Sequence, residues 1–247
     1  FYDHLDDLVR PMKRFSNAKE LLFENPDDGT RKSNPGLGSS ITVRVASSGG
    51  KKVGVNQGAA GVGRGDRIDL LHASEVAFWP RGAETFTGFS QAVPDEPGTM
   101  VAMESTANGA AGFFWSEWQR AVSGDSGYTP IFVPWFDHPN YRASVIAINR
   151  DEWLPSEDDI KYCEEFYDAS LAMQNSRAEK IADRLKLDQH EQMLINKYRC
   201  DWDQIMWRRY CIKFKARSPE IFDVEYPCNA DVAFASSGLP RFNNDKL

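Results

Sequence analysis

The amino-acid sequence predicts an α/β protein in which a parallel sheet between residues 40 and 140 is followed by a helical region. The first observation is a pair of apolar runs, residues 68–73 and 99–105, each of which ends in polar side chains before a turn or helix begins. Such runs are typical of buried parallel strands that deliver polar groups to the carboxyl edge of a sheet. The second is the composition of residues 156–216, where long polar helix formers are combined with apolar residues at helical spacing. A strand, helix, strand order with short turns indicates a sheet covered by helices.

Before the first apolar run, the chain is expected to begin with helix and to continue through loops into one strand. The apolar spacing in residues 1–24 favours an amphipathic helix that is interrupted or restarted at Pro11. Residues 25–40 are rich in Gly, Pro and Asn and predict a loop, and the β-branched, alternating residues 41–46 predict a strand. Residues 57–66 form a glycine-rich connector. Because phosphate-binding glycine loops precede a helix and this one precedes a strand, a flexible loop is the favoured interpretation.

The middle of the chain predicts alternating helices and strands. Residues 82–92 favour a helix or an irregular segment. A helix is expected over residues 110–122, with Asn108 as its N-cap and Gly124 at its end. Residues 128–135 predict a further strand. The expected organisation has three parts: a partial sheet domain in residues 1–140, a helical subdomain in residues 141–217 and a linker in residues 218–247.

Composition limits the possible partners of the chain. Its 247 residues carry a formal net charge of −7, so any contact with nucleic acid must come from a local basic patch and not from the field of the whole surface. The four cysteines lack zinc-site spacing and are expected to be reduced thiols. No apolar run reaches the roughly 18–20 residues of a membrane helix, and no membrane partner is expected. The chain begins with Phe1 and not with Met, so we expect it to be a piece of a longer protein.

Polar residues after the two apolar runs are the candidates for chemistry. Glu75 follows the first run, where nucleotide-hydrolysing α/β proteins place the carboxylate that orients water; a merely solvated glutamate is about equally consistent with the spacing. Ser74 has a hydroxyl that suits Mg²⁺ or a turn. Ser105, Thr106 and Asn108 follow the second run and have hydrogen-bonding groups that suit a phosphate sensor, although a plain strand-to-helix turn explains them as well.

Two further groups of residues leave other functions open. Glu75 and Glu104, together with Asp69, would suit a metal-dependent nuclease if the strand ends were adjacent. Residues 208–217 interleave bases with aromatic side chains, which favours either a phosphate contact or a solvated helix face with its aromatics in the core. The candidate DNA or phosphate contacts are Arg208, Arg209, Lys213 and Lys215. His72, on a predicted buried strand, is expected to be a packed histidine.

Taken together and in order, several short motifs resemble the ATPase domain of the large terminase subunit of tailed bacteriophages. They are Gly63-Arg64-Gly65, the run from Leu71 to Trp79, the run from Glu104 to Gly109, Val133-Pro134-Trp135-Phe136, Gln204-x-x-Trp207-Arg208-Arg209, Glu225-Tyr226-Pro227 and Ala233-Phe234-x-x-Ser237-Gly238. These motifs span most of residues 55–242, which makes the resemblance much more specific than any one of them.

The resemblance implies a P-loop ATPase core of the ASCE type, incomplete at its N-terminus, that uses ATP and Mg²⁺ to drive viral double-stranded DNA into a procapsid. Glu75 would activate water, Ser74 would assist Mg²⁺ at a Walker B element, and Arg64 would complete a neighbouring subunit's site. The motif that couples hydrolysis to DNA movement would be Ser105, Thr106, Ala107 and Asn108. The implied partners are DNA, the portal protein, the small terminase subunit and further copies in a ring, within the host cell cytoplasm. A fragment that binds DNA or assembles the ring without catalysis is the remaining alternative.

Three departures from the family pattern have consequences. Ser74 stands where the Walker B pattern has Asp, so magnesium coordination is expected to be weaker or mediated by water. The sequence contains no G-x-x-x-x-G-K-[ST] motif, and no nuclease domain follows within the 247 residues. Since ATP hydrolysis in such motors needs the P-loop lysine and amides, we predict that this chain alone does not hydrolyse ATP appreciably.

Overall fold

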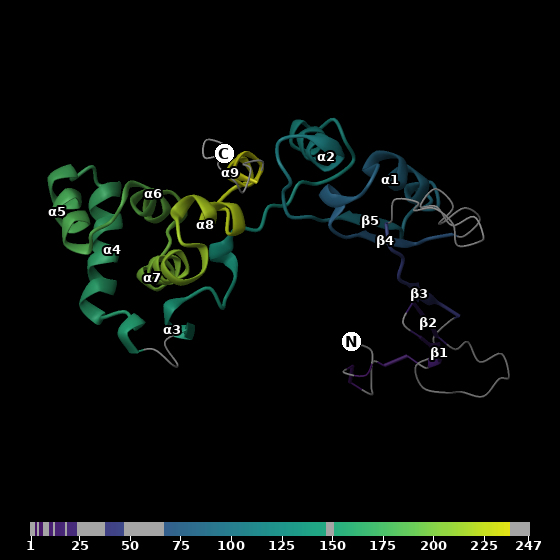
Figure 1. The fold of residues 1–247 in the computed structure, drawn as a ribbon, viewed down its shortest axis with the longest axis horizontal. Helices are drawn as coiled ribbons and strands as arrows, with labels where there is room; N and C mark the ends of the chain where they lie inside the picture. The colour runs from purple at the N-terminus through teal and green to yellow at the C-terminus, as the bar shows by residue number, and fades with distance from the viewer. Residues whose placement is uncertain are drawn as a thin grey trace, which may run out of the picture. The chain divides into compact units, whose positions relative to one another are not determined.

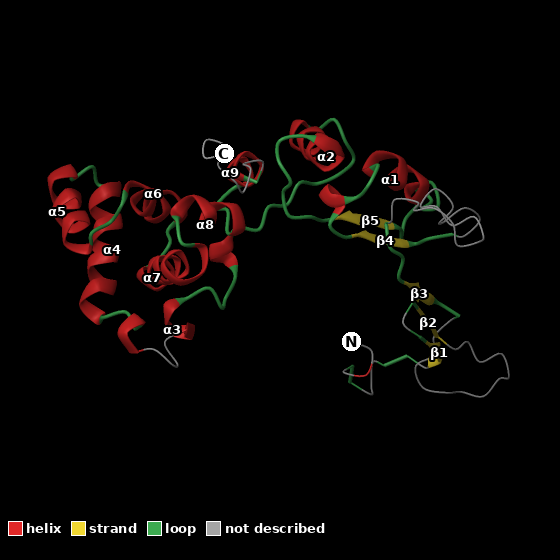
Figure 2. Ribbon diagram, viewed as in Figure 1, coloured by secondary structure: helices red, strands yellow, loops and turns green. Residues whose placement is uncertain are grey.

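The structure is α/β: helix accounts for about 52% of the residues that it describes, and one small two-stranded sheet is parallel, which confirms the predicted class at this level. The structure, a computed structural model, describes residues 3, 5–6, 10–11, 13–17, 19–23, 38–46, 67–146 and 151–237. Two compact units are formed, the first by residues 1–71 and 79–101 and the second by residues 72–78 and 102–247. In the described residues the strands all precede residue 104, and the chain after them is helical or irregular (Figures 1 and 2).

The first unit contains a three-stranded antiparallel sheet with the order β1-β2-β3. Its strands are β1 (Lys13–Ser16), β2 (Glu20–Phe23) and β3 (Ser40–Thr42). Ser16 pairs with Leu21 across the first ladder, and Glu20 pairs with Thr42 across the second. The strand predicted at residues 41–46 is thus present in shortened form, but it belongs to this antiparallel sheet and not to the parallel sheet predicted for residues 40–140. Residues 24–37 lie outside the described part of the chain, as does the glycine-rich connector with Arg64.

The helix predicted for residues 1–24 is wrong over the described residues 13–17 and 19–23, because strands β1 and β2 form a hairpin there. The turn is closed by the Asn17 side chain, whose Oδ1 accepts hydrogen bonds from the amides of Lys19 (2.7 Å) and Glu20 (2.8 Å). An asparagine that bonds its own following amides favours a turn over a continuous helix. The apolar spacing in so short a window fits either structure, and the turn decides between them.

Helix α1 (Gly82–Ser90) also belongs to the first unit, so of the two alternatives for residues 82–92 the helix is the one that forms. Phe86 and Phe89 are buried on one side of it, and the ring of Phe89 lies 6.0 Å from the ring of Trp79. Two aromatic side chains three residues apart therefore fix the buried face of this helix.

Strands β4 (Leu70–Ala73) and β5 (Met100–Met103) pair in parallel, and both were predicted. The expectation that they are buried is wrong for Leu70 and Met100, which are exposed, whereas Ala73 is buried. The amide of Met100 donates to the carbonyl of Asp69 (2.8 Å) at one end, and the amide of Glu104 donates to the carbonyl of Ala73 (2.9 Å) at the other. Each strand begins in the first unit and ends in the second. The carboxyl ends of both strands therefore lie together in the second unit.

Helix α2 (Gly112–Ser123) follows β5 and ends at Gly124, as predicted; Gly124 takes a left-handed conformation with φ 80°. Its N-cap is Ala111 and not Asn108, which makes a different contact described below. The strand predicted over residues 128–135 is also wrong, since residues 128–134 form no ladder and the 3₁₀ turn η4 (Trp135–Asp137) follows. Proline at positions 130 and 134 removes two backbone donors that a central strand needs.

The rest of the second unit is helical, as predicted for residues 156–216. It contains α3 (Ala143–Ile146), η6 (Asp151–Trp153), α4 (Glu157–Leu171), α5 (Asn175–Leu185), α6 (Gln189–Tyr198), α7 (Trp202–Cys211), the π-helix η7 (Ile212–Ala216), α8 (Pro219–Glu225) and α9 (Ala230–Ser236). Helices α4 and α5 lie side by side (Figure 1). No helix among the described residues is long and apolar enough to cross a bilayer.

Local sequence signals explain where these helices start. The Ser156 hydroxyl accepts a hydrogen bond from the amide of Asp159, which caps α4. Asp188 and Glu191 form a capping box at α6, and Asp201 and Gln204 form another at α7. In each box two otherwise unpaired amides at the helix start are satisfied by side chains.

Helices α8 and α9 lie in the segment that we expected to be a linker, residues 218–247. Phe222 of α8 is completely buried and packs against Trp135 and Trp207, with ring centres 5.7 and 5.9 Å away. The buried core of the helical region thus extends beyond residue 217 and includes α8.

Candidate active site

The end of strand β4 turns sharply at Glu75. This residue has φ 56°, in the left-handed region that side chains with a Cβ rarely adopt. The carbonyl of Glu75 accepts the amide of Phe78 (3.0 Å), which closes the 3₁₀ turn η3 (Val76–Phe78). Val76 is 1% exposed, and its amide donates to the carbonyl of Glu104 (3.2 Å). The turn is therefore anchored from both sides, and the exposed Glu75 side chain leaves it at a fixed point.

The carboxylate of Glu75 meets two hydroxyl groups from the loop after β5. Ser105 Oγ lies 3.4 Å and Thr106 Oγ1 lies 3.3 Å from the same oxygen, Glu75 Oε2, and both hydroxyls donate to it. The two residues are 30 and 31 positions away in sequence. Both contacts are longer than a strong hydrogen bond to a carboxylate, so each is weak, but their convergence on one oxygen favours a single orientation of the Glu75 side chain.

The same loop also holds the backbone of the turn that follows Glu75. Ser105 Oγ accepts the amide of Ala77 (3.1 Å), and Asn108 Nδ2 donates to the Ala77 carbonyl (3.3 Å). Asn108 therefore bridges the two loops where we had expected a helix cap. Ala107 lies half-buried between these contacts. Of the predicted coupling residues, Ser105, Thr106 and Asn108 contact the Glu75 turn directly.

Ser74 and Arg64 were the residues predicted to assist Mg²⁺ and ATP, and the structure describes one of the two. Ser74 is exposed at the end of β4, next to Glu75. Arg64 lies outside the described residues. Within the described ranges no group of three His, Cys, Asp or Glu side chains has the geometry of a metal site.

The carboxylates of the nuclease alternative have separate partners. Glu104 Oε1 lies 3.5 Å from Nε2 of His72, which is exposed and not packed as expected. Asp69 belongs to the first unit, where its Oδ1 accepts from Arg67 Nε (2.8 Å). Glu75 bonds instead to the hydroxyls described above. Each of the three side chains therefore has its own contacts.

A contact that sequence reasoning missed ties the loop after β5 to the last described helix. The amide of Gly109 donates to Oγ of Ser237, 2.8 Å away and 128 residues later. Next to it, the ring of Phe234 on α9 lies 4.6 Å from the ring of Trp115 on α2. The only sequence signal for this contact was the presence of Phe234 and Ser237 in a motif of the family resemblance. The loop that holds Glu75 is thus bonded to the end of the helical region.

The basic stretch at residues 208–217 is divided between the core and the surface. Arg208 is 1% exposed, with Nη1 at 3.3 Å from Asp188 Oδ2 and 3.4 Å from Glu191 Oε1. Arg209 donates to both oxygens of Glu191 (2.8 and 2.7 Å) and to the carbonyls of Leu185 and Lys186. Burial lowers the pKa of Arg209, but the hydrogen bonds and charge of Glu191 raise it above its ordinary value. Arg208 and Arg209, which the sequence offered as candidate DNA or phosphate contacts, join α6 and α7 in the structure.

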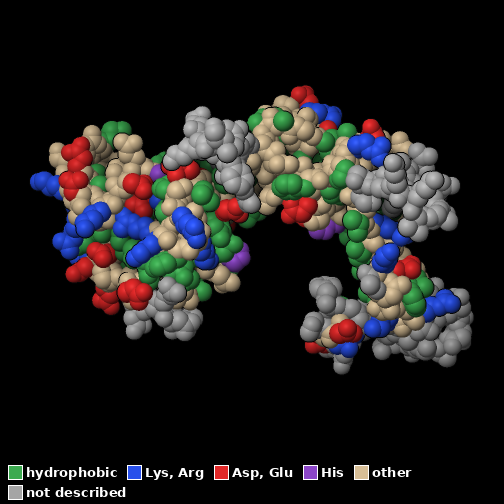
Figure 3. Space-filling model, viewed as in Figure 1, with side chains coloured by type: hydrophobic (Ala, Val, Ile, Leu, Met, Phe, Trp, Pro, Cys, Tyr) green, Lys and Arg blue, Asp and Glu red, His purple; other side chains and the backbone are tan. Residues whose placement is uncertain are grey.

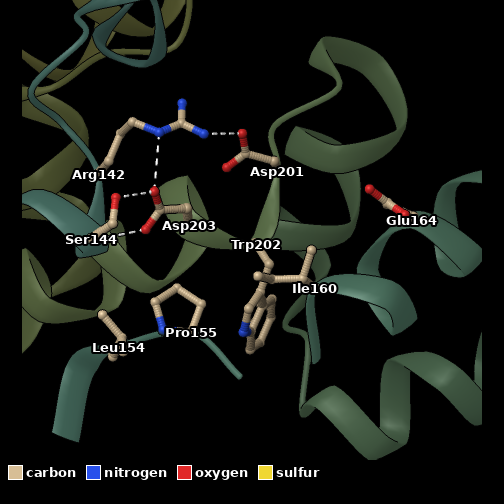
Figure 4. Close-up of a pocket in the computed structure, with 9 residues that line it drawn as sticks. All are labelled: Arg142, Ser144, Leu154, Pro155, Ile160, Glu164, Asp201, Trp202 and Asp203. Atoms are coloured by element: carbon tan, nitrogen blue, oxygen red, sulfur yellow. Dashed lines mark hydrogen bonds and ion pairs between the residues drawn. The ribbon is translucent and has the colours of Figure 1, made fainter. Parts of the chain in front are cut away.

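A pocket of about 380 Å³ lies where α7 begins, close to the start of α4 (Figure 4). Its apolar wall is formed by Leu154, Ile160 and Trp202. Its polar rim is internally bonded: Arg142 pairs with Asp201 and with Asp203 (3.0 Å). The amide and hydroxyl of Ser144 add hydrogen bonds to Asp203 of 2.6 and 2.5 Å. These contacts fasten the segment around α3 to the start of α7, which is a structural role.

Comparison with protein-family models and with curated proteins finds no match to this chain. The Glu75 site and its contacts are therefore the basis for assigning a function.

Proposed function

We propose that this chain is part of an ATP-driven DNA-packaging motor, the large terminase subunit of a tailed bacteriophage. In this proposal Glu75 is the carboxylate that activates water for ATP hydrolysis. The single observation that carries it is the contact of Glu75 Oε2 with Ser105 and Thr106 at the adjacent ends of two parallel strands. The resemblance assigns the same residues to a catalytic glutamate and a coupling motif, although they are 30 residues apart. Ligand chemistry in open α/β sheets is found at this edge.

In this proposal the residues of this chain act mainly by orienting the Glu75 carboxylate. The Ser105 and Thr106 hydroxyls would hold one oxygen of Glu75, which leaves the carboxylate able to accept a hydrogen bond from water through its other oxygen. The left-handed turn at Glu75 would keep the side chain at the strand end. Bound ATP, with Mg²⁺ as part of the substrate, would supply the phosphoryl group that is cleaved. Ser74 and Glu75 present exposed oxygen atoms, the ligand type that Mg²⁺ prefers.

The other parts of the proposal extend from the resemblance. A P-loop core of the ASCE type would be completed by a Walker A segment, which this sequence does not contain. Arg64 would act on a neighbouring copy in a ring, and the motor would work with the portal protein and the small terminase subunit in the host cytoplasm. Double-stranded DNA would be the cargo.

The decisive experiment measures ATP turnover, with and without double-stranded DNA, in the full-length gene product and in its Glu75→Gln variant. Loss of a general base typically lowers the rate by about 100-fold or more. We expect the variant to lose turnover at least to that extent and to keep its affinity for ATP, because glutamine retains the shape of glutamate but cannot take a proton. Equal turnover in both proteins would refute the role of Glu75.

A companion measurement uses the 247-residue chain itself. We expect no appreciable turnover from it, since it has no G-x-x-x-x-G-K-[ST] motif. Steady hydrolysis by this chain would contradict the proposal that its phosphate-binding lysine comes from another segment.

A further inference from the structure

The exposed half of the basic stretch carries a group of cations close to exposed aromatic surface. Lys213 and Lys215 lie on the π-helix η7 (Ile212–Ala216), and Arg217 follows it; all three are exposed. A π-helix is rare in proteins and is frequently found at functional sites. Arg208 and Arg209, by contrast, are held by Asp188 and Glu191. In the described part of the chain, none of the three exposed cations forms an ion pair.

An aromatic cluster lies beneath Lys213. Its Nζ is 5.6 Å from the ring centre of Trp153 and 5.0 Å from that of Phe214. The Trp153 ring also contacts Tyr210 and Phe214, with centres 5.3 and 5.8 Å away. Phe214 is nevertheless 46% exposed. The rings attract the ammonium group and limit its freedom, so less side-chain entropy is lost when Lys213 binds an anion.

The nearest carboxylate in the following sequence has hydrogen-bond partners of its own. Glu220 lies in the first turn of α8, where it is bonded to its own amide and to the hydroxyl of Ser218. These hydrogen bonds lower the pKa of Glu220. On the face of the helical region that Figure 3 shows, Lys and Arg side chains are interspersed with acidic ones. The segment from Lys213 to Arg217 therefore concentrates positive charge on a chain whose net charge is −7.

We propose that Lys213, Lys215 and Arg217 form a contact surface for the phosphate backbone of double-stranded DNA, with Phe214 packing beside it. Regularly spaced phosphates are the partner that such a local cationic group fits, because the chain as a whole repels polyanions. This inference rests on the proposed function in naming DNA as the cargo. Its test needs neither ATP nor Glu75, so the two proposals fail separately.

The test is the binding of the 247-residue chain to a fluorescently labelled DNA duplex of mixed sequence, followed by anisotropy at several salt concentrations. The variant is Lys213→Ala/Lys215→Ala. The matched control is Lys161→Ala/Lys180→Ala, which removes the same charge from exposed positions on α4 and α5. Circular dichroism checks that both variants are folded.

Each phosphate contact contributes about 0.9 to the steepness with which the logarithm of the affinity falls as the logarithm of the salt concentration rises. At roughly 50 mM salt, one such contact raises the affinity about tenfold. We expect the Lys213→Ala/Lys215→Ala variant to lower the slope by about 1.8 and to bind about 100-fold more weakly. The control should leave the slope unchanged.

Three results would overturn the proposal. The first is an equal loss in the control variant, which would mean that only overall charge matters. The second is the absence of salt-dependent binding by the parent chain. The third is binding of poly-glutamate with the same affinity, lost in the same variant, which would identify an acidic protein as the partner.

Discussion

Replacing Glu191 with alanine tests whether Arg208 and Arg209 are structural. Glu191 is 2% exposed, and its two carboxylate oxygens accept hydrogen bonds from both arginines. It also accepts the amide of Asp188 (3.2 Å) as the second half of the capping box of α6. The substitution would leave the buried Arg208 guanidinium with Asp188, at 3.3 Å, and with the nearby charge of Asp223. Asp188 is half-exposed and compensates the charge less well.

The expected cost follows from these contacts. Removing one partner of a buried ion pair typically costs about 3–5 kcal/mol, because the other charge stays buried and unpaired. The substitution also removes half of the capping box of α6. Because a whole cap contributes only about 1 kcal/mol, this loss does not move the total out of the range. For a chain of this size, each kcal/mol lowers the melting temperature by about 2–4 °C. We therefore expect Glu191→Ala to lower the free energy of unfolding by about 4 kcal/mol and the melting temperature by roughly 10 °C.

Urea unfolding followed by circular dichroism at 222 nm measures this loss, since helices dominate the signal. Glu179→Ala, at an exposed position on α5, is the control and should stay within about 0.5 kcal/mol of the parent. The contrary result is a loss below about 1 kcal/mol for Glu191→Ala, with an unchanged slope of the unfolding free energy against urea concentration. It would show that the two arginines do not need the Glu191 carboxylate to stay buried. The structural assignment of Arg208 and Arg209 would then be wrong.

Two further predictions concern Glu75 and the thiols. Glu75→Gly should be more stable than Glu75→Ala by about 1 kcal/mol in thermal unfolding, because only the alanine has a Cβ that opposes φ 56°. An alanine variant that is at least as stable would mean that this turn is not left-handed. Burial raises the pKa of the Cys163 and Cys200 thiols to about 12, which leaves very little reactive thiolate at pH 8. Mass spectrometry after iodoacetamide treatment should find both unmodified until urea is added; rapid labelling of the native chain would contradict their burial.

Several elements could be read directly from the sequence because their signals are local. The apolar runs before Glu75 and before Glu104 became the parallel strands β4 and β5. Gly124 ended α2 because glycine adopts the left-handed conformation at low cost. The helices between residues 156 and 216 followed from apolar spacing and good helix formers. Each of these signals acts within a few residues, so neighbouring sequence was sufficient.

The predictions were wrong where the structure of a segment depends on the contacts that its residues make. The apolar spacing near the N-terminus fits a helix, but the turn that follows Asn17 joins strands β1 and β2 into a hairpin. The segment 128–134 has strand composition and found no ladder, since two prolines remove donors and pairing needs a neighbour that composition cannot reveal. Asn108 had the character of a cap, but the carbonyl of Ala77 lay within its reach.

The candidate site shows the same division between local and distant causes. The sequence by itself placed carboxylate and hydroxyl groups at the ends of two strands, because strand patterns and turn residues are local. Only the tertiary structure decided that Glu75 meets Ser105 and Thr106, that Gly109 bonds to Ser237, and that Arg208 pairs with Glu191. These pairs are 17 to 128 residues apart. Such contacts depend on which surfaces pack together and on how burial forces charges to find partners, and neither is encoded in the spacing of nearby residues.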